Sequence, residues 1–221
     1  MKLFLSAFTK LIFGIALIGA MLFLPAWTVY YPNGWLFIAL LFIPMVIMGA
    51  VLFLKSPDLL KKRLDGKEKD GAQRGVVAAA GISFILGFII SSLDFRFKWT
   101  RVPLWVVISA SILFLIGYAL YAEVMRENAY LSRTVKVEEN QKVISTGLYA
   151  AVRHPMYLAT LLMFLPIPLI LGSFWGIIPF LLYPPAIIIR IINEERLLTN
   201  ELIGYSEYKK KTKYRLIPFI W

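Results

Sequence analysis

The sequence predicts an all-α integral membrane protein with about six transmembrane helices, of which the last two form a short kinked hairpin, followed by a cytosolic C-terminal helix. Composition is the first observation behind this prediction: of 221 residues, 59% are hydrophobic and 17% are charged, and the mean hydropathy is +0.72. Such a chain lacks the polar residues that cover a soluble domain. The second observation is that the apolar residues form long runs, and the third is that basic residues are concentrated between those runs.

Six apolar runs define the predicted helices, at about residues 8–31, 33–54, 76–93, 102–124, 156–171 and 173–190. The first four have the 18 or more apolar residues that cross a hydrocarbon core of roughly 30 Å. The first is too long for the apolar region of a secretory signal, so we expect it to remain in the chain. The last two are shorter and contain Pro166, Pro168, Pro179, Pro184 and Pro185. They favour a kinked hairpin that turns near Gly172 and Ser173, since membrane helices tolerate prolines when neighbours satisfy the freed backbone groups.

The basic residues predict the orientation. Six spans place both termini and the long loops on one side, which then holds 21 of the 24 Lys and Arg residues, while the 94–101 turn on the other side holds three. The positive-inside rule assigns the richer side to the cytosol. The net charge of +11 is therefore explained by topology and contact with anionic membrane lipids. We expect no nucleic-acid partner, because no nucleic-acid-binding motif accompanies the basic residues.

Composition also excludes several kinds of chemistry. The chain has no cysteine, so it has no disulfide, cysteine nucleophile or thiolate metal site, and with one histidine we expect no metal centre. We find no GxGxxG or P-loop pattern and no internal repeat. We expect a single membrane domain, 1–221, with a four-helix N-terminal part (1–124) and a C-terminal part (125–221).

Two connecting segments are expected to lie at membrane surfaces. Residues 55–75 mix seven basic with four acidic residues and predict a solvated loop with a short helix on the cytosolic side. On the opposite side, the 94–101 turn is followed by Trp105 and contains Trp99, so we expect it to anchor the chain at the interface.

The stretch GLYAAVRHPMYL stands out because polar residues precede an apolar helix. Pro155 suits the first turn of a helix, where its missing N–H costs nothing. Arg153 and His154 then lie at the membrane–water boundary, beside a helix N-terminus whose free N–H groups favour an anionic ligand. Tyr157 follows three residues after His154 on nearly the same face. Gly147 suits a turn or a close approach to a ligand.

A second polar group follows the last apolar run, in RIINEERLL. Arg190 and Glu194 are four residues apart and share one helix face, and Glu195 follows directly. Adjacent carboxylates at a membrane exit are costly unless they are paired with cations or a ligand. An interfacial salt bridge alone would also explain the Arg190–Glu194 pair. Because the two motifs begin and end one hairpin, we expect them to meet.

These motifs, followed by GYSEYKKKTKYRLIP, resemble the isoprenylcysteine carboxyl methyltransferase family of integral membrane methyltransferases and the related phospholipid methyltransferases. The resemblance covers roughly residues 120–221. It implies a cofactor-binding catalytic part at 125–221 and S-adenosylmethionine as the methyl donor. It also implies a lipophilic small-molecule or lipidated acceptor that arrives from the membrane, at an active site on the cytosolic side.

Carried over to this chain, the resemblance implies catalytic roles for Arg190 and Glu194. The residues implied in cofactor binding are Gln141, Val143, Gly147, Tyr149, Arg153, His154, Tyr157, Glu194 and Glu195. For Arg153, binding of the cofactor's carboxylate and bracing of the fold both remain open. A carboxylate acceptor is already ionised, whereas an amine acceptor would need a base, for which His154 or a glutamate is the candidate.

Two alternatives come from other classes. A membrane NADPH-dependent reductase of the steroid 5α-reductase type has a similar helix entry, but such enzymes usually carry asparagine and glutamate just after RHP. Here Met156 and then Leu158, Ala159 and Thr160 follow. The other alternative is a non-enzymatic membrane protein in which the glutamate pair is structural.

Overall fold

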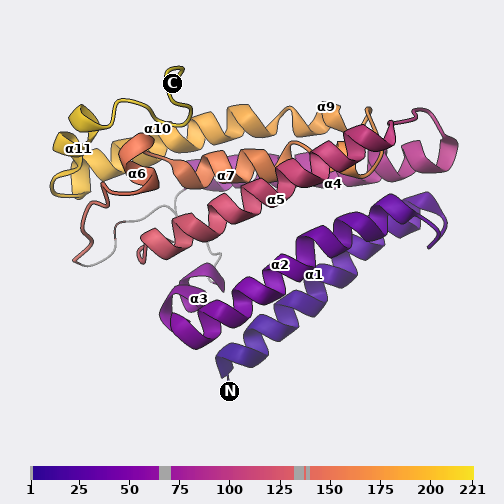
Figure 1. Cartoon of the computed structure of the whole chain (residues 1–221), viewed down its shortest axis with the longest axis horizontal. Helices are drawn as coiled ribbons and strands as arrows, with labels where there is room; N and C mark the ends of the chain where they lie inside the picture. Colours follow the sequence, from indigo (N-terminus) through magenta and orange to yellow (C-terminus); the bar gives the residue numbers. More distant parts are fainter. Residues whose placement is uncertain (1, 65–70, 132–136, 138–139) are drawn as a thin grey trace.

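The protein is all-helical in the part described by the computed structural model, which covers residues 2–64, 71–131, 137 and 140–221 (Figure 1). Within these residues, five segments are long and apolar enough to cross a membrane: α1 (Lys2–Ala26), α2 (Pro32–Lys55), Arg74–Phe97 of α4 (Gly71–Phe97), α5 (Leu104–Glu127) and Ile177–Glu201. Pro155–Ile170 is a shorter apolar segment. The predicted all-α membrane fold is confirmed; of the six predicted spans, five meet the length of a full crossing and the sixth is this shorter arm.

The last two predicted spans form a hairpin broken where prolines lie. Its first arm comprises α7 (Pro155–Phe164) and α8 (Ile167–Ile170), and its second comprises α9 (Ile177–Phe180) and α10 (Tyr183–Glu201). Pro166 is the residue before α8, and α10 has proline in its first turn. The chain reverses at Gly172, whose φ of +78° suits glycine, as the sequence predicts. The helix α10 continues beyond the apolar run, because the polar residues after Arg190 are also good helix formers.

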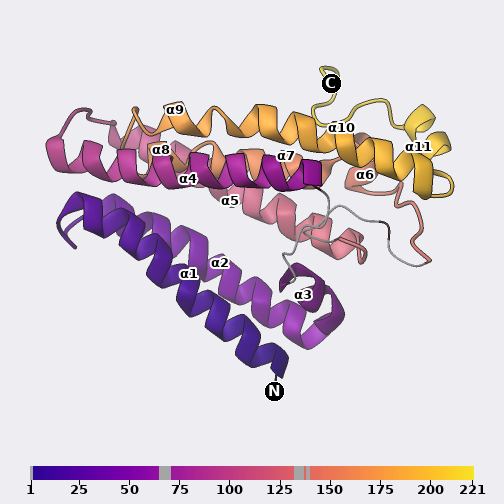
Figure 2. The ribbon, with the colours of Figure 1, turned by 180° about the vertical axis from the view of Figure 1, so that it is seen from behind.

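Short helices lie at the end of the bundle that carries the C-terminus. They are α3 (Pro57–Leu64), α6 (Leu148–Ala151) and α11 (Tyr205–Lys211). Figures 1 and 2 place all three toward the same end, away from the connection between α4 and α5. The helix α3 lies within the charged 55–75 segment, where a short helix was predicted; residues 65–70 of that segment are outside the described ranges.

The C-terminal hairpin packs against two long helices. The helix α7 lies on α5 and α10 lies on α4, while the α1–α2 hairpin crosses this group with α1 against α4 (Figures 1 and 2). The contact between α5 and α7 depends on Gly117, where an added Cβ would lie 2.8 Å from the backbone nitrogen of Met163. Small residues allow this close approach of membrane helices.

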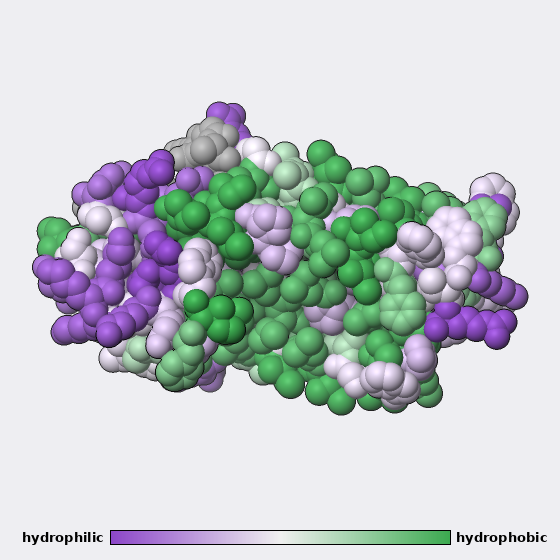
Figure 3. All heavy atoms as spheres, turned by 90° about the horizontal axis from the view of Figure 1, so that it is seen from above, coloured by the Kyte–Doolittle hydropathy of each residue, from purple (hydrophilic) through white to green (hydrophobic). Residues whose placement is uncertain are grey.

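The outer surface of the long helices is apolar. Large hydrophobic side chains such as Ile47, Ile112 and Leu181 are exposed. Figure 3 shows a hydrophobic band between two more polar ends. Large exposed apolar areas on a monomer mark contact with a partner or a membrane, and here they surround helices of membrane-spanning length. The chain is therefore an integral membrane protein.

Candidate functional site

The RHP motif forms a helix entry, as predicted. Pro155 is the first residue of α7 and His154 precedes it. The backbone N–H of Arg153 donates to the carbonyl of Tyr214 (2.9 Å), and that of His154 donates to the carbonyl of Arg215 (2.8 Å). The C-terminal tail therefore returns to α7 and holds the two residues before the helix in place.

Glu195 anchors this arrangement from α10. Its Oε1 accepts a hydrogen bond from Arg153 Nε (2.6 Å) and its Oε2 accepts one from Arg215 Nε (2.8 Å). His154 Nε2 lies 3.4 Å from Oε1. Arg153 Nη1 donates to the backbone carbonyls of Thr212 and Lys213. Buried charges persist when they are paired and hydrogen-bonded in this way, so Glu195 ties α10, the helix entry and the tail together.

Arg190 and Glu194 meet through a tyrosine rather than directly. Arg190 Nε donates to the hydroxyl oxygen of Tyr157 (2.9 Å), and that hydroxyl donates to Glu194 Oε2 (2.5 Å). Arg190 and Tyr157 are buried, whereas Glu194 is only half-buried. We call this Arg190–Tyr157–Glu194 chain the relay. Arg190 and Glu194 lie four positions apart on α10, and Tyr157 joins them from α7. The predicted meeting of the two motifs is thus observed.

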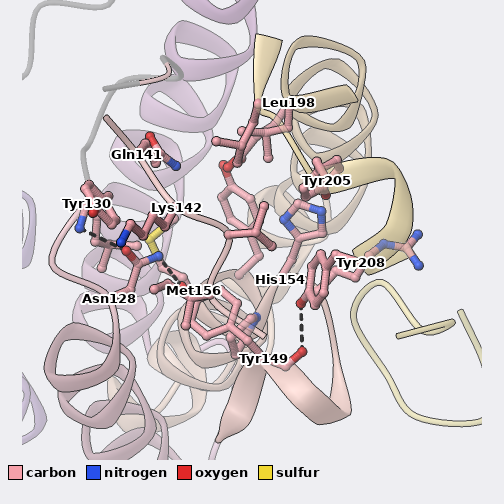
Figure 4. A pocket seen from close by; sticks show the side chains of 18 of the residues that line it. Asn128, Tyr130, Gln141, Lys142, Tyr149, His154, Met156, Leu198, Tyr205 and Tyr208 are labelled. Atoms are coloured by element: carbon pink, nitrogen blue, oxygen red, sulfur yellow. Dashed lines mark hydrogen bonds between the residues drawn. The ribbon is translucent and has the colours of Figure 1, made fainter. Parts of the chain in front are cut away.

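A cavity opens beside this relay. It contains about 840 Å³ of empty space, part of it open to solvent. Figure 4 shows His154, Tyr205 and Tyr208 on one side of it, with Asn128 and Gln141 on the other. Eight of the predicted site residues line the cavity: Gln141, Val143, Tyr149, Arg153, His154, Tyr157, Arg190 and Glu194.

The other two predicted residues, Gly147 and Glu195, are not in the lining. The Glu195 carboxylate forms ion pairs with Arg153 and Arg215 instead. Gly147 has φ +57°, and a Cβ on it would overlap the carboxylate of Glu127. That carboxylate accepts the backbone N–H of Leu148 (2.9 Å), so Gly147 allows a turn that leads into α6.

Three tyrosines form an aromatic wall. Tyr149 Oη accepts a hydrogen bond from Asn128 Nδ2 (2.8 Å), and the Tyr149 carbonyl accepts one from the Tyr208 hydroxyl (2.7 Å). Burial raises the pKa of Tyr208 to about 12, so its hydroxyl remains protonated and donates at neutral pH. Burial, and then the nearby charges of Glu195 and Glu194, raise the pKa of Tyr205 still further.

Sequence reasoning missed Asn128, Tyr205, Tyr208 and Arg215. The two tyrosines belong to the GYSEY segment that contributed to the family resemblance, so a signal for them was present without a role. Asn128 follows the end of α5, where nothing in the sequence distinguishes it from another polar end of a helix.

Two buried polar atoms around the cavity lack a hydrogen-bond partner among the described residues: His154 Nε2 and the Tyr205 hydroxyl. Such atoms are costly in a folded protein unless a ligand or water satisfies them. Both side chains line the cavity. The Tyr205 hydroxyl is therefore available to a polar ligand, whereas His154 Nε2 also lies 3.4 Å from Glu195 Oε1. In the same described part of the chain, no group of three or more His, Asp or Glu side chains could hold a metal.

Comparisons with known proteins find similarity to methyltransferases. Residues 105–204, which run from α5 to the end of α10, match the phospholipid methyltransferase family. No curated protein matches the chain. A solved structure, the eukaryotic intramembrane Ras methyltransferase ICMT (isoprenylcysteine carboxyl methyltransferase), has a similar fold, with a TM-score of 0.58 and 20% sequence identity over 93% of this chain and 75% of that one.

The resemblance predicted from the sequence is thereby confirmed, with the family match falling on the part of the chain that builds the cavity. The family match supports methyltransferase activity, and the solved structure shows a similar fold.

Proposed function

We propose that this protein transfers a methyl group from S-adenosylmethionine to a lipophilic acceptor in the cavity between α7, α10 and α11. The observation that carries the proposal is the Arg190–Tyr157–Glu194 relay on the wall of that cavity, within the segment that matches a methyltransferase family. The cofactor would supply an electrophilic methyl group on a sulfonium.

The residues around the cavity fit the cofactor's chemical groups. Glu194 is half-buried, and its carboxylate suits the cofactor's ammonium or ribose hydroxyls. The Tyr205 hydroxyl has no hydrogen-bond partner in the described part of the chain and suits a hydrogen-bonding group of the ligand, and the His154 ring also lines the cavity. Tyr149 offers an aromatic face to an adenine ring or a cation. Gln141 and Val143 also line the cavity, and we assign them to its enclosure.

Two residues are proposed to brace the site rather than to bind in it. Arg153 lines the cavity, but three of its hydrogen bonds go to Glu195 and to the tail. Glu195 holds Arg153 and Arg215. Both are therefore assigned to positioning His154 at the cavity edge, and Gly147 to shaping the turn beside it.

The chain's own contribution to the reaction is alignment. Methyl transfer is an in-line displacement, and it is accelerated when the nucleophile is held at near contact with the methyl carbon. Arg190, whose Nε donates to the Tyr157 hydroxyl, is proposed to hold an anionic acceptor. An acceptor carboxylate would need no base, whereas an amine would have to lose a proton, for which Glu194 or His154 is in reach of the cavity.

The acceptor is proposed to be lipophilic because apolar side chains share the lining with these polar groups. Leu131, Met156, Leu198 and Leu202 all contribute. The cavity also lies at one end of helices of membrane-spanning length, so a lipid or lipidated molecule can reach it without leaving the membrane. The basic residues predict that this end is cytosolic.

Binding of S-adenosylhomocysteine to the purified chain in detergent tests the proposal. We expect saturable binding by calorimetry, and incorporation of label into lipid or protein when membranes receive a labelled methyl donor. A folded sample that binds neither S-adenosylmethionine nor S-adenosylhomocysteine would refute the proposal, and saturable binding of NADPH would favour the reductase alternative.

A further inference from the structure

A second cavity lies at the other end of the bundle, far from the methyl-transfer site. It contains about 670 Å³ of empty space, part of it open to solvent. It is lined by Ala26, Thr28, Asp94, Phe95, Arg96, Lys98, Thr100, Arg101 and Gly172. These residues come from the end of α1, the end of α4, the 98–101 connection and the turn of the C-terminal hairpin. The cavity therefore joins these four parts of the chain at one membrane surface.

The acidic residue of this cavity is turned toward protein. Asp94 is only 1% exposed, and it accepts hydrogen bonds from the Thr100 backbone N–H (2.7 Å), the Thr100 hydroxyl (2.6 Å) and the Ser173 hydroxyl (2.5 Å). Both carboxylate oxygens are occupied by these bonds. Asp94 thus fixes the loop and the hairpin turn, and it is poorly placed to hold a cation in the cavity.

The exposed charges of the cavity are all positive. Arg96, Lys98 and Arg101 are exposed, and no carboxylate among the described residues pairs with them. The Arg96 guanidinium lies 5.1 Å from the ring centres of Trp27 and Phe97, which holds it by cation–π contact without neutralising it. These three are also the only basic residues assigned to this side of the membrane.

The surroundings place the cavity at the level of lipid headgroups. Trp27, Trp99 and Trp105 are each at least half exposed. Tryptophans are enriched at the membrane–water interface, where their apolar rings meet the headgroups. Figure 3 shows polar side chains projecting beyond the hydrophobic band at both ends of the molecule. A headgroup lying beside this aromatic belt would reach the three cations directly.

We propose that this cavity binds the phosphate group of an anionic membrane lipid, with Arg96, Lys98 and Arg101 as its ligands. Arginine pairs with phosphate through two parallel hydrogen bonds, and lysine contributes a compact charge. Thr28 adds a hydroxyl, whose oxygen already accepts the Tyr30 N–H (3.0 Å) and whose proton can be donated. The bound lipid would link α1, α4 and the hairpin turn on the face opposite the methyl-transfer site.

Thermal denaturation in detergent tests this inference. The full chain would be titrated with a short-chain phosphatidylglycerol, with the matching phosphatidylcholine and with inorganic phosphate. We expect phosphatidylglycerol alone to raise the midpoint, and the triple variant Arg96→Gln, Lys98→Gln, Arg101→Gln to weaken its apparent affinity by about tenfold or more. Each shift is measured against the lipid-free midpoint of the same variant. Because Arg96 also contacts Trp27, the single variant Lys98→Gln serves as a milder second test and should weaken the response in part.

The matched control removes three exposed basic residues from the other end, by Lys210→Gln, Lys211→Gln and Lys213→Gln. It should respond to phosphatidylglycerol as the unaltered chain does. An equal response of both triple variants would overturn the proposal, as would a response to phosphatidylcholine of the same size. If inorganic phosphate at the same concentration reproduces the shift, the cavity takes a free anion and the assignment to a lipid is wrong.

Discussion

Glu194 and Glu195 are neighbours in the sequence, yet the structure gives them different surroundings. Successive residues of a helix point about 100° apart. Glu195 therefore turns toward Arg153 and Arg215, behind the cavity, while Glu194 turns toward Tyr157 at its wall. The same substitution at the two positions should separate a ligand-binding role from a structural one.

The variant Glu194→Gln should bind S-adenosylhomocysteine about tenfold or more weakly, because it loses a charge-assisted contact with the ligand. Its amide oxygen still accepts the Tyr157 hydroxyl, so the thermal midpoint should change little. Isothermal calorimetry measures the affinity. Glu201→Gln, which alters an exposed glutamate at the end of the same helix, is the matched control. Unchanged affinity in Glu194→Gln would remove this residue from the binding site.

The variant Glu195→Gln should instead lower stability. Arg153 is only 8% exposed, and breaking a buried ion pair from one side costs about 3–5 kcal/mol because it leaves the other charge uncompensated. The thermal midpoint in detergent should fall well below that of Glu194→Gln. A midpoint equal to that of the unaltered chain, combined with weakened ligand binding, would show that Glu195 binds the cofactor directly, as the family resemblance implies.

At the scale of elements, the site depends on how closely two helices approach. Tyr157 lies on α7, and α7 is positioned by its contact with α5 at Gly117. The three nearest atoms to an added Cβ there lie within 3.0 Å and include the backbone nitrogen of Met163 and the carbonyl oxygen of Ala159. Backbone atoms cannot move aside as a flexible side chain can. A larger residue would therefore displace α7 and the relay with it.

The variant Gly117→Leu should destabilise the protein by about 1–3 kcal/mol or prevent its folding, as overpacking does in tight interiors. Gly49→Leu is the matched control, because nothing lies within 4 Å of a Cβ at that position. Comparison of folded yield and thermal midpoint in detergent tests the pair. If both variants behave alike, the α5–α7 contact is not tight in solution.

At the scale of the whole molecule, the two ends differ in charge and in what they hold. One end has the cavity in which we propose methyl transfer, and the other has Asp94 and the three-cation cavity. Charged residues lie at the two ends because a charge in the hydrocarbon core is energetically costly. The orientation of the bundle then decides which membrane surface the candidate cavity faces.

The absence of cysteine makes the orientation testable with single introduced cysteines. Ser206→Cys lies on α11 at the end with the candidate cavity, and Val29→Cys lies at the opposite end; both positions are exposed. In intact cells, an impermeant thiol reagent should label Val29→Cys only, and it should label Ser206→Cys after the cells are opened. The reverse pattern would place the cavity outside the cytosol.

Sequence reasoning anticipated the membrane fold and much of the candidate site. Hydropathy located the long helices, prolines located the breaks of the last hairpin, and Pro155 located the entry of α7. The sequence also predicted that the RHP motif and the polar part of α10 lie close together, because the two ends of a short hairpin return to the same membrane surface. It assigned both Glu194 and Glu195 to the cofactor and did not anticipate that Glu195 would be held by Arg153 and Arg215.

By itself, the sequence determined that this chain crosses a membrane several times and carries two polar motifs at the ends of one helical hairpin. These properties follow from sums over neighbouring residues, such as the transfer free energy of an apolar run. Only the tertiary structure decided that Tyr157 links Arg190 to Glu194, that the tail engages Arg153, and that Tyr205 reaches the cavity. Those contacts depend on the rotation of each helix about its axis and on the path of the tail. Packing between distant segments sets both, and no local pattern of residues encodes it.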